Sequence, residues 1–251
     1  EGVAFADYGS ETDWTKEVTR DFPVSHVHNF ILRGGHKQTN YVATFNYRSM
    51  QGVIIESDNR NINGRVDLNH NMFDNKLRFN VNITTNNNKY RSLKEGGSFD
   101  GKIFRLATVL NPTAPVKDEF GNWFEQTAVA RFENPLALIY ESSGESQSQT
   151  QRLNGSLVFE PVKRLEFKAV TSYSKFNSLY GYMETKKHIS TIRDAMNGFA
   201  TKSNQQSVDR LLELTAQYTA ELGSHKVLGL AGYSFQDNFY ESSYLQNWDF
   251  P

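Results

Sequence analysis

Residues 61–86 read NINGRVDLNHNMFDNKLRFNVNITTN, and this stretch decides the fold class. Apolar and polar residues alternate on both sides of a turn at Asp74–Asn75. Because side chains change face at every residue of a strand, the pattern predicts a β-hairpin with one apolar and one polar face. Each run lasts about 10 residues, which is longer than the usual globular strand and matches a tilted bilayer crossing.

The two faces of this hairpin predict opposite environments. The polar face is too rich in Arg, Asn and Asp to form the second buried layer of a sandwich. We expect lipid around Ile62, Val66, Leu68, Phe79, Val81 and Ile83. We expect a lumen, or a plug within it, around Asn63, Arg65, Asp67, Arg78 and Asn80.

The composition favours a transmembrane β-barrel. Of the 251 residues, 38% are apolar and 13% are aromatic, and the mean hydropathy is −0.60. No apolar run is long enough for a membrane helix, whereas alternating barrel strands average to a polar composition. The lack of cysteine excludes disulfides and thiolate metal sites. The net charge of −1, with no basic run, argues against nucleic-acid binding.

The same alternation recurs along the chain and predicts an all-β fold, a transmembrane antiparallel β-barrel with eight up-and-down strands. Short turns join the strands in pairs, and Gly34–Gly35 would supply the positive φ of the first turn. Arg210 breaks the apolar face of its strand, and we expect it near the strand end, where a long side chain can snorkel. The strands lie near 28–34, 39–49, 61–72, 77–86, 150–160, 165–177, 207–222 and 226–238.

The longer connections, 51–60, 87–149 and 178–206, all fall at one end of the predicted sheet. Transmembrane barrels have tight periplasmic turns and longer extracellular loops, so the pattern predicts that these connections lie outside the cell. The insertion 87–149 should contain two short helices. One follows from apolar spacing after residue 99, and the other begins at Asn134–Pro135, a capping residue followed by Pro in the first turn.

Eight strands can close the smallest such barrel, or they can be a slice of a larger one. An open sheet cannot be the final state in lipid, because each orphaned backbone group costs several kcal/mol. Residues 1–25 read as irregular chain at the end of one outer loop, and residues 239–251 read as the start of another. Both observations favour part of a larger barrel over a complete eight-stranded one.

Several segments together resemble the SusC-like branch of TonB-dependent outer-membrane transporters of Bacteroidetes. The resemblance implies part of a plugged barrel of about 22 strands. The family's plug domain, TonB-contacting segment and carboxypeptidase-like extension are absent from these residues. The matching segments are Asp13–Trp14 with EVTR at 17–20, HNFILRGGHKQTNYVATFNYRSMQGVI at 28–54, Asn63–Gly64–Arg65, NPTAPVKDEFGNWFE at 111–125, NPLALI at 134–139 and LAGYSFQ at 230–236.

The resemblance also implies a function. The family imports large nutrients across the bacterial outer membrane, most often an oligosaccharide and sometimes a peptide. A SusD-like surface lipoprotein caps the barrel, and the TonB complex supplies energy through the plug. This chain would contribute barrel wall, facing the lipid bilayer, and extracellular loops. Two alternatives stay open: a complete eight-stranded barrel with a structural or adhesive role, and a barrel enzyme of the lipase or protease type.

The candidate contact residues are of two kinds. Aromatic residues of the predicted loops could stack on sugar rings or a lid protein, or pack among themselves. They are Trp123, Phe124, Tyr140, Tyr180 and Tyr182. Charged residues of the polar face could line a solute path, or pair with each other. They are Arg65, Asp67, Arg78, Arg152, Glu166 and Lys168.

Metal and catalytic motifs are not evident. His26 and His28 would share one strand face, but no third ligand follows at a useful spacing, so we expect no metal. Ser172 to Lys175 matches an acylase SxxK pattern, but it lies on a predicted strand and not at a helix start, so we read it as chance. With no nucleophile elbow, phosphate loop or dinucleotide fingerprint, we expect neither an enzyme nor a cofactor.

Overall fold

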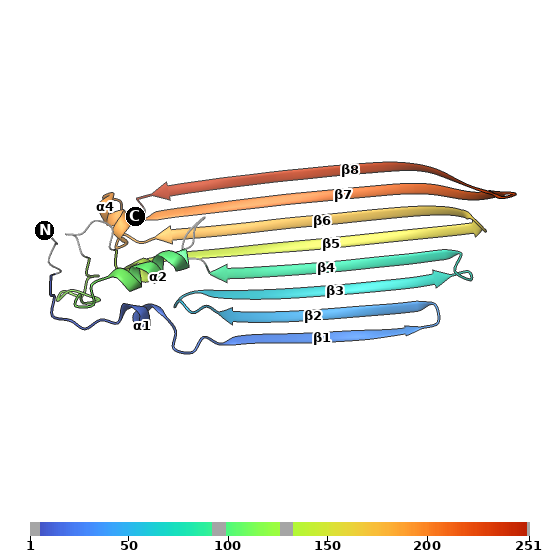
Figure 1. The fold of residues 1–251 in the computed structure, drawn as a ribbon. Coiled ribbons are helices and arrows are strands. Elements are labelled where there is room, and N and C mark those ends of the chain that lie inside the picture. Colours follow the sequence, from blue (N-terminus) through green and yellow to red (C-terminus); the bar gives the residue numbers. More distant parts are fainter. Residues whose placement is uncertain (1–5, 92–98, 126–132, 250–251) are drawn as a thin grey trace.

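The structure, a computed structural model, describes residues 6–91, 99–125 and 133–249. Eight antiparallel strands form a single sheet in chain order, as the alternation predicted (Figure 1). They are β1 (Ser25–His36), β2 (Thr39–Gln51), β3 (Asp58–Met72), β4 (Leu77–Arg91), β5 (Ser142–Val162), β6 (Leu165–Glu184), β7 (Phe199–Leu222) and β8 (His225–Trp248). Within the described ranges β1 and β8 form opposite edges, and the sheet is open.

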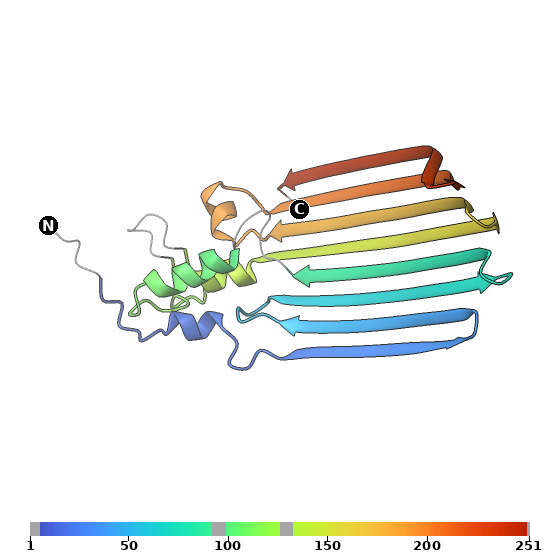
Figure 2. The same cartoon turned by 45° about the vertical axis from the view of Figure 1, so that its right-hand side comes forward.

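All helices gather at one end of the sheet, which we call the loop end, and tight turns occupy the other, the turn end (Figures 1 and 2). The helices are α1 (Trp14–Val18), α2 (Phe99–Val109), α3 (Pro135–Tyr140) and α4 (Ile189–Arg193). No helix in the described part of the chain is long and apolar enough to cross a membrane.

The register keeps each strand's apolar residues side by side across the sheet. In the central hairpin Val66 pairs with Ile83 and Leu68 with Val81, so the two apolar runs share one face, as the alternation predicted. Ile83 then pairs with Leu153 on β5. We call this continuous apolar surface the belt. Its residues run from Tyr41 to Tyr47, Ile62 to Leu68, Leu77 to Ile83, Leu153 to Phe159, Leu165 to Tyr173, Leu212 to Ala220 and Val227 to Phe235, taking every second residue.

The belt crosses the strands obliquely. Its edge toward the loop end is Tyr47 on β2, and the ladder leads from Tyr47 across the sheet to Gln206 on β7. On β7, however, the edge is Leu212, six residues nearer the turn end. Over five steps between strands, with about 3.4 Å per residue and about 4.8 Å per step, this drift corresponds to a strand tilt of about 40°. Transmembrane barrels have strand tilts of about 35–45°.

Strands β5 to β8 continue far beyond the belt at the loop end. Strands β7 and β8 have 24 residues each, whereas β1 has 12. The expected loop 178–206 is therefore wrong in extent, because β6 reaches Glu184 and β7 begins at Phe199. In these extensions polar residues occur on both faces, with apolar side chains such as Phe176, Leu179 and Phe239 scattered among them, so the strict alternation disappears while the backbone ladder continues.

Three other expected boundaries also change. The connection between β2 and β3 shrinks to 52–57, and that between β4 and β5 to 92–141. Residues 239–248 form the end of β8, not a loop, because they complete the ladder with β7. Arg210 lies in the middle of β7 and not near its end, directly beyond the belt. Its side chain pairs with Asp237 at 3.1 Å on the neighbouring strand.

The first turn does not use its glycines as expected. Gly34 and Gly35 belong to β1, and Lys37 takes the positive φ, at 42°. Both glycines instead lie where a neighbour approaches closely, a backbone atom at Gly35 and the movable Tyr41 hydroxyl at Gly34. A Cβ on Gly34 would lie 2.6 Å from the Tyr41 hydroxyl, and one on Gly35 would lie 2.7 Å from a backbone oxygen.

The loop end carries a small hydrophobic core, which we call the cap. It combines the segment before β1, the connection 52–57, and helices α2 and α3. The expectation of irregular chain over residues 1–25 is wrong for α1, because Trp14 and Val18 are buried against this core. The core residues are Trp14, Val18, Ile54, Ile103, Leu106, Ala107, Leu110, Ala114, Leu136, Leu138 and Ile139.

Hydrogen bonds fix the cap's segments to one another. The Arg20 guanidinium donates from Nη1 to three carbonyl oxygens of the 52–57 connection, at 2.6 to 2.9 Å. Asn134 caps α3 as predicted: its Oδ1 accepts from the backbone N–H groups of Leu136 and Ala137. The same side chain donates to the carbonyls of Val116 and Phe124. The cap is therefore a packed unit.

Candidate functional site

The connection between β6 and β7 folds into a compact loop around α4. His188 caps this helix, and its Nδ1 accepts from the Ser190 N–H at 3.3 Å. Thr191, which is 2% exposed, donates its hydroxyl toward the carbonyls of Thr185 and His188 at 2.7 and 2.8 Å. These bonds close a tight turn of chain over the loop end of the sheet.

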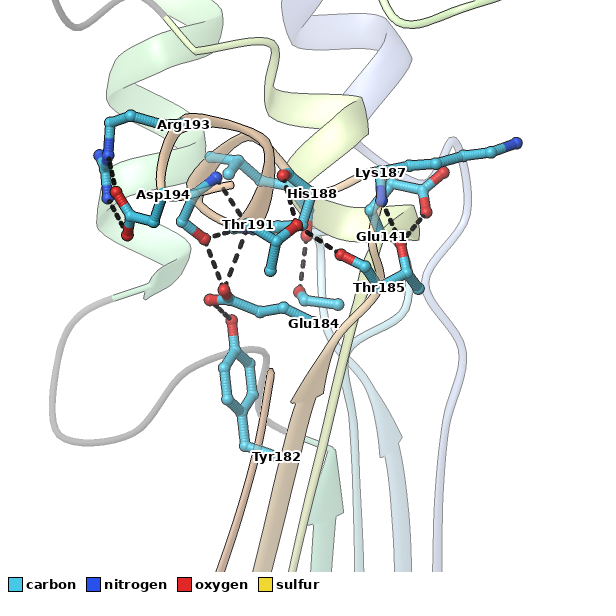
Figure 3. Close-up of polar contacts among 12 residues, drawn as sticks. Glu141, Tyr182, Glu184, Thr185, Lys187, His188, Thr191, Arg193 and Asp194 are labelled. Carbon is cyan, nitrogen blue, oxygen red and sulfur yellow. Dashed lines mark hydrogen bonds and ion pairs between the residues drawn. The ribbon is translucent and has the colours of Figure 1, made fainter. Parts of the chain in front are cut away.

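Glu184, at the end of β6, is the centre of a buried polar network (Figure 3). Its carboxylate accepts from the Tyr182 hydroxyl at 2.7 Å and from the Ser190 hydroxyl at 2.5 Å. The His188 ring lies against the same carboxylate, with Nδ1 at 3.4 Å. Glu184 and His188 are almost fully enclosed, with side chains 10% and 7% exposed. The network holds the α4 loop on the strand ends.

Ser190, His188 and Glu184 do not form a nucleophilic relay. In a catalytic triad the histidine lies between hydroxyl and carboxylate and uses a different ring nitrogen for each. Here the Ser190 hydroxyl and the Glu184 carboxylate both approach Nδ1, and the carboxylate also accepts from the hydroxyl directly. The arrangement is a structural helix cap.

A cavity of about 530 Å³ opens beside this network, and we call it the α4 pocket. One wall is aromatic. The Phe199 ring lies 5.7 Å from Trp248 and 6.4 Å from Tyr182, measured between ring centroids, so the three rings form a row across β6, β7 and β8. Tyr182 is buried, whereas Trp248 is 40% exposed. The row therefore offers an indole surface to a bound molecule.

Charged residues also line the α4 pocket. Lys102 pairs with Glu133, and Arg193 pairs with Asp194 at 2.8 Å. The hydrogen bond from Asp194 raises the pKa of the Arg193 guanidinium, and the bond from Arg193 lowers the pKa of the Asp194 carboxyl. Both groups are therefore charged at neutral pH. Aromatic faces together with charged donors and acceptors suit a polar ligand with an apolar side.

Glu141, directly after α3, joins the α4 loop to the cap. Its backbone carbonyl accepts from Thr185 N–H at 2.8 Å, and its carboxylate accepts from the Thr185 hydroxyl. The other carboxylate oxygen accepts from the Trp123 indole N–H at 2.8 Å. One carboxylate therefore connects two loops that are far apart in the sequence.

The five candidate aromatic residues separate into two places. Trp123 and Tyr140 stack in parallel at 5.9 Å in the cap, with the Lys117 ammonium 4.6 Å from the indole. Phe124 contacts Tyr8 edge to face at 5.0 Å. Tyr180 and Tyr182 lie on β6 and not in a loop, and of the five only Tyr182 lines the α4 pocket.

The six candidate charged residues all share the polar face of the sheet. Three ion pairs involve them: Arg65 with Asp67 at 2.6 Å, and Arg78 with Glu166 at 2.9 Å and Glu160 at 3.8 Å. Arg152 and Lys168 lie on the same face through the ladder. Neutral amides continue these contacts: Asn82 donates to Asp67 at 2.6 Å, and Asn154 to Asn82 at 3.3 Å.

His26 and His28 lie side by side on β1, with ring centroids 6.3 Å apart. In the part of the chain that the structure describes, no three His, Asp or Glu side chains gather as a metal site would require.

Sequence reasoning did not identify the other pocket residues, in particular Phe199, Trp248, Glu184 and Arg193. The only available signal was the aromatic residue near each expected loop boundary. Those boundaries were misplaced, so the three strand ends could not be aligned.

Comparison with known sequences gives two relatives. The chain is 25% identical to the TonB-dependent receptor P3 of Formosa agariphila over 235 residues, covering 90% of this chain and 23% of the relative. It is 30% identical over 138 residues to the TonB-dependent receptor SusC of Bacteroides thetaiotaomicron, covering 52% of this chain and 13% of the relative. The chain thus spans less than a quarter of the length of the curated relatives it matches. No family model matches the sequence.

Solved structures with the same fold include a structure of the RagAB peptide transporter, with a TM-score of 0.72 and 17% identity. That match covers 97% of this chain and 28% of the other. The P. aeruginosa FpvA structure with a bound pyoverdine–iron complex is more distant, with a TM-score of 0.56, 10% identity, and coverage of 88% and 26%.

Fold, belt and relatives together define the chain as part of a TonB-dependent outer-membrane β-barrel. Within that class, its sequence is similar to the SusC-like branch, as its sequence motifs indicated. The open sheet is consistent with this assignment, because the eight strands match only about a quarter of the RagAB chain.

Proposed function

We propose that this chain forms wall and extracellular mouth of a TonB-dependent importer of a large nutrient. The observation that carries the proposal is the two-faced sheet: an oblique apolar belt on one side, and a hydrogen-bonded polar face on the other. The belt faces lipid and the polar face lines the lumen or contacts a plug. The loop end, with the cap and the α4 pocket, faces the cell exterior.

The α4 pocket supports an oligosaccharide as the substrate. A sugar ring presents C–H groups that pack on an aromatic face, here the exposed Trp248 indole. Its hydroxyls can bond to the charged groups of the same pocket, such as Arg193 and Asp194. Peptides are the competing class, since the RagAB structure of the same fold is described as a peptide transporter.

Two partners follow from the family. A SusD-like surface lipoprotein would cover the loop end, and the TonB complex would act through a plug domain. The cap offers exposed apolar groups to such a lipoprotein, among them Phe104 on α2, 50% exposed, and Phe120, 81% exposed. Co-purification of a lipoprotein with the membrane-extracted protein tests this assignment. The double variant with Phe104→Asp and Phe120→Asp should no longer co-purify with the lipoprotein.

The alternative of a complete eight-stranded barrel has less support. Such a barrel requires β1 to pair with β8, and within the described ranges these strands are the two edges of the sheet.

Growth of a deletion strain on a panel of polysaccharides and peptides tests the function. We expect loss of growth on one polysaccharide, restored by the wild-type gene. A Trp248→Ala variant should need about 3–10-fold more substrate for the same uptake rate, the size expected for one aromatic contact. Tyr244→Ala, on β8 outside the pocket, is the matched control. Loss of growth on peptides alone would refute an oligosaccharide as the substrate. Unchanged growth on every nutrient would refute the proposed role in import.

A further inference from the structure

The belt face of the sheet does not end where the belt ends. On strands β2 to β8 it continues toward the loop end, and the first residue beyond the belt on each strand forms an oblique row that we call the collar. The collar consists of Ser49, Arg60, Thr85, Gln151, Lys175, Arg210 and Asp237. At the turn end the belt stops at the turns, so only one side of the belt has this continuation.

The collar is basic. It holds three cations and one carboxylate, and that carboxylate, Asp237, pairs with Arg210 at 3.1 Å. Among the described residues, no acidic side chain forms an ion pair with Arg60 or Lys175. The Arg210 side chain is 59% exposed despite its ion pair. The row at the edge of the hydrocarbon therefore attracts anions.

Amides follow the collar toward the loop end on β5, β6 and β7. Gln149, Asn177 and Gln206 form one ladder row, which continues to the Glu241 carboxylate on β8, and Gln147 lies one step further along β5. Among the described residues these four amide side chains make no hydrogen bond. On the polar face, by contrast, Asn80 donates to Asn69 at 2.7 Å and Asn69 to Asn40 at 3.1 Å. The outward amides thus remain open to a partner outside the protein.

The height of these rows distinguishes between possible partners. With a tilt of about 40°, two residues along a strand rise about 5 Å toward the exterior. A phospholipid head-group layer is only about 5–7 Å thick, so it can cover the collar. The amides lie about 10–15 Å above the belt by the same geometry, where only a larger head group reaches.

We propose that the collar and the outward amides bind an outer-leaflet glycolipid with a phosphorylated sugar head group, a lipopolysaccharide. Its phosphates would lie against Arg60, Lys175 and Arg210, and its sugar hydroxyls would bond to the amides. The surface is continuous with the lipid-facing belt, so a lipid is its natural occupant. The inference rests on the orientation proposed above, with the loop end outward, and is independent of the imported substrate.

The test is a binding titration of the purified, membrane-extracted protein with lipopolysaccharide and, separately, with phosphatidylglycerol vesicles. Each of Arg60→Gln and Lys175→Gln should weaken both interactions about fivefold, as expected for one basic residue at an anionic surface. Gln149→Ala with Asn177→Ala should weaken lipopolysaccharide binding only. Arg152→Gln and Lys168→Gln, on the polar face of β5 and β6, are the matched controls.

Three outcomes would overturn the proposal. Unchanged lipopolysaccharide affinity in the amide variant would show that the surface recognises only charge. Equal losses of affinity in the polar-face controls would show a nonspecific charge effect. Equal affinity of the wild type for both lipids would exclude the glycolipid as the preferred ligand. Nutrient uptake measured on the same variants separates this inference from the proposed function. Uptake can be lost while lipid binding persists, and lipid binding can be lost while uptake persists.

Discussion

The belt and the cap shield apolar side chains from water by opposite means. In the belt, Val66, Ile83 and Leu157 remain 45%, 48% and 41% exposed in the protein alone. In the cap, Ile103 and Leu106 are fully buried by protein atoms. In the proposed function the belt takes its apolar environment from lipid, whereas the cap builds its own from protein atoms.

This difference predicts unequal tolerance to change. A packed core loses both transfer free energy and contacts when a side chain is shortened, since its neighbours relax only partly. A surface in lipid loses the transfer free energy alone, because acyl chains fill the space. An added charge has the opposite consequence. The belt tolerates a shortened side chain well but a charged one poorly, because the bilayer core has no polar group that can pair with the charge.

Shortening one leucine in each region is the sharpest test, with the largest expected effect in the cap. Leu106→Ala should destabilise the cap by about 2–5 kcal/mol. Leu157→Ala in the belt should cost only about 1–2 kcal/mol, because no cavity remains. Hydrogen exchange of α2 amides measures the first, and urea unfolding in vesicles the second. Equal costs would mean that the belt is covered by protein and not by lipid.

Charge in the belt should have the next largest effect. Leu214→Arg places a guanidinium on the lipid side of β7 and should cost about 2–4 kcal/mol if the site is near the bilayer midplane. Thr215→Arg, one residue away on the polar face, should cost much less. Folding yield into vesicles compares the two. A soluble, stable Leu214→Arg protein would contradict the membrane assignment.

Within the cap, the capping residue of α3 should have a smaller effect. Asn134→Ala removes the acceptor for two helix N–H groups and should cost about 0.5–2 kcal/mol. The substitution also leaves the Val116 and Phe124 carbonyls without their donor. Asn122→Ala, in an exposed turn of the cap, is the control. Hydrogen exchange of the α3 amides should accelerate in the first variant and not in the second.

The pH dependence of the cap should be the weakest effect. Burial, opposed by a hydrogen bond from the Asn134 N–H, raises the pKa of the Glu125 carboxyl from 4.5 to about 7. The folded cap therefore favours the protonated form, so its stability is greatest below pH 4.5 and falls as the pH rises to about 7. Glu125→Gln should remove this dependence, whereas Glu119→Gln should keep it. Exchange rates of α3 amides at pH 5 and pH 8, corrected for intrinsic rates, measure it.

Comparing expected with observed elements shows where sequence reasoning works. The hairpin of β3 and β4, its two faces and the cap of α3 follow from nearest-neighbour patterns, and the structure confirms them. The predicted loop 178–206 is wrong in extent, because residues 199–206 belong to β7, where apolar and polar residues no longer alternate. Tyr182 was the one candidate that lines the pocket, and its partners Phe199 and Trp248 lie on strand ends that the expected boundaries misplaced.

The sequence by itself determined the two faces of each strand, the order of the strands and the resemblance to SusC-like transporters. Alternation is a local property, set by the geometry of successive residues, and it persists wherever one face meets lipid and the other water. Only the tertiary structure decided how far the strands extend beyond the belt, how α1 joins the cap, and which residues meet in the α4 pocket. Those outcomes depend on backbone ladders and contacts between distant segments, and neither leaves a periodic pattern in the chain.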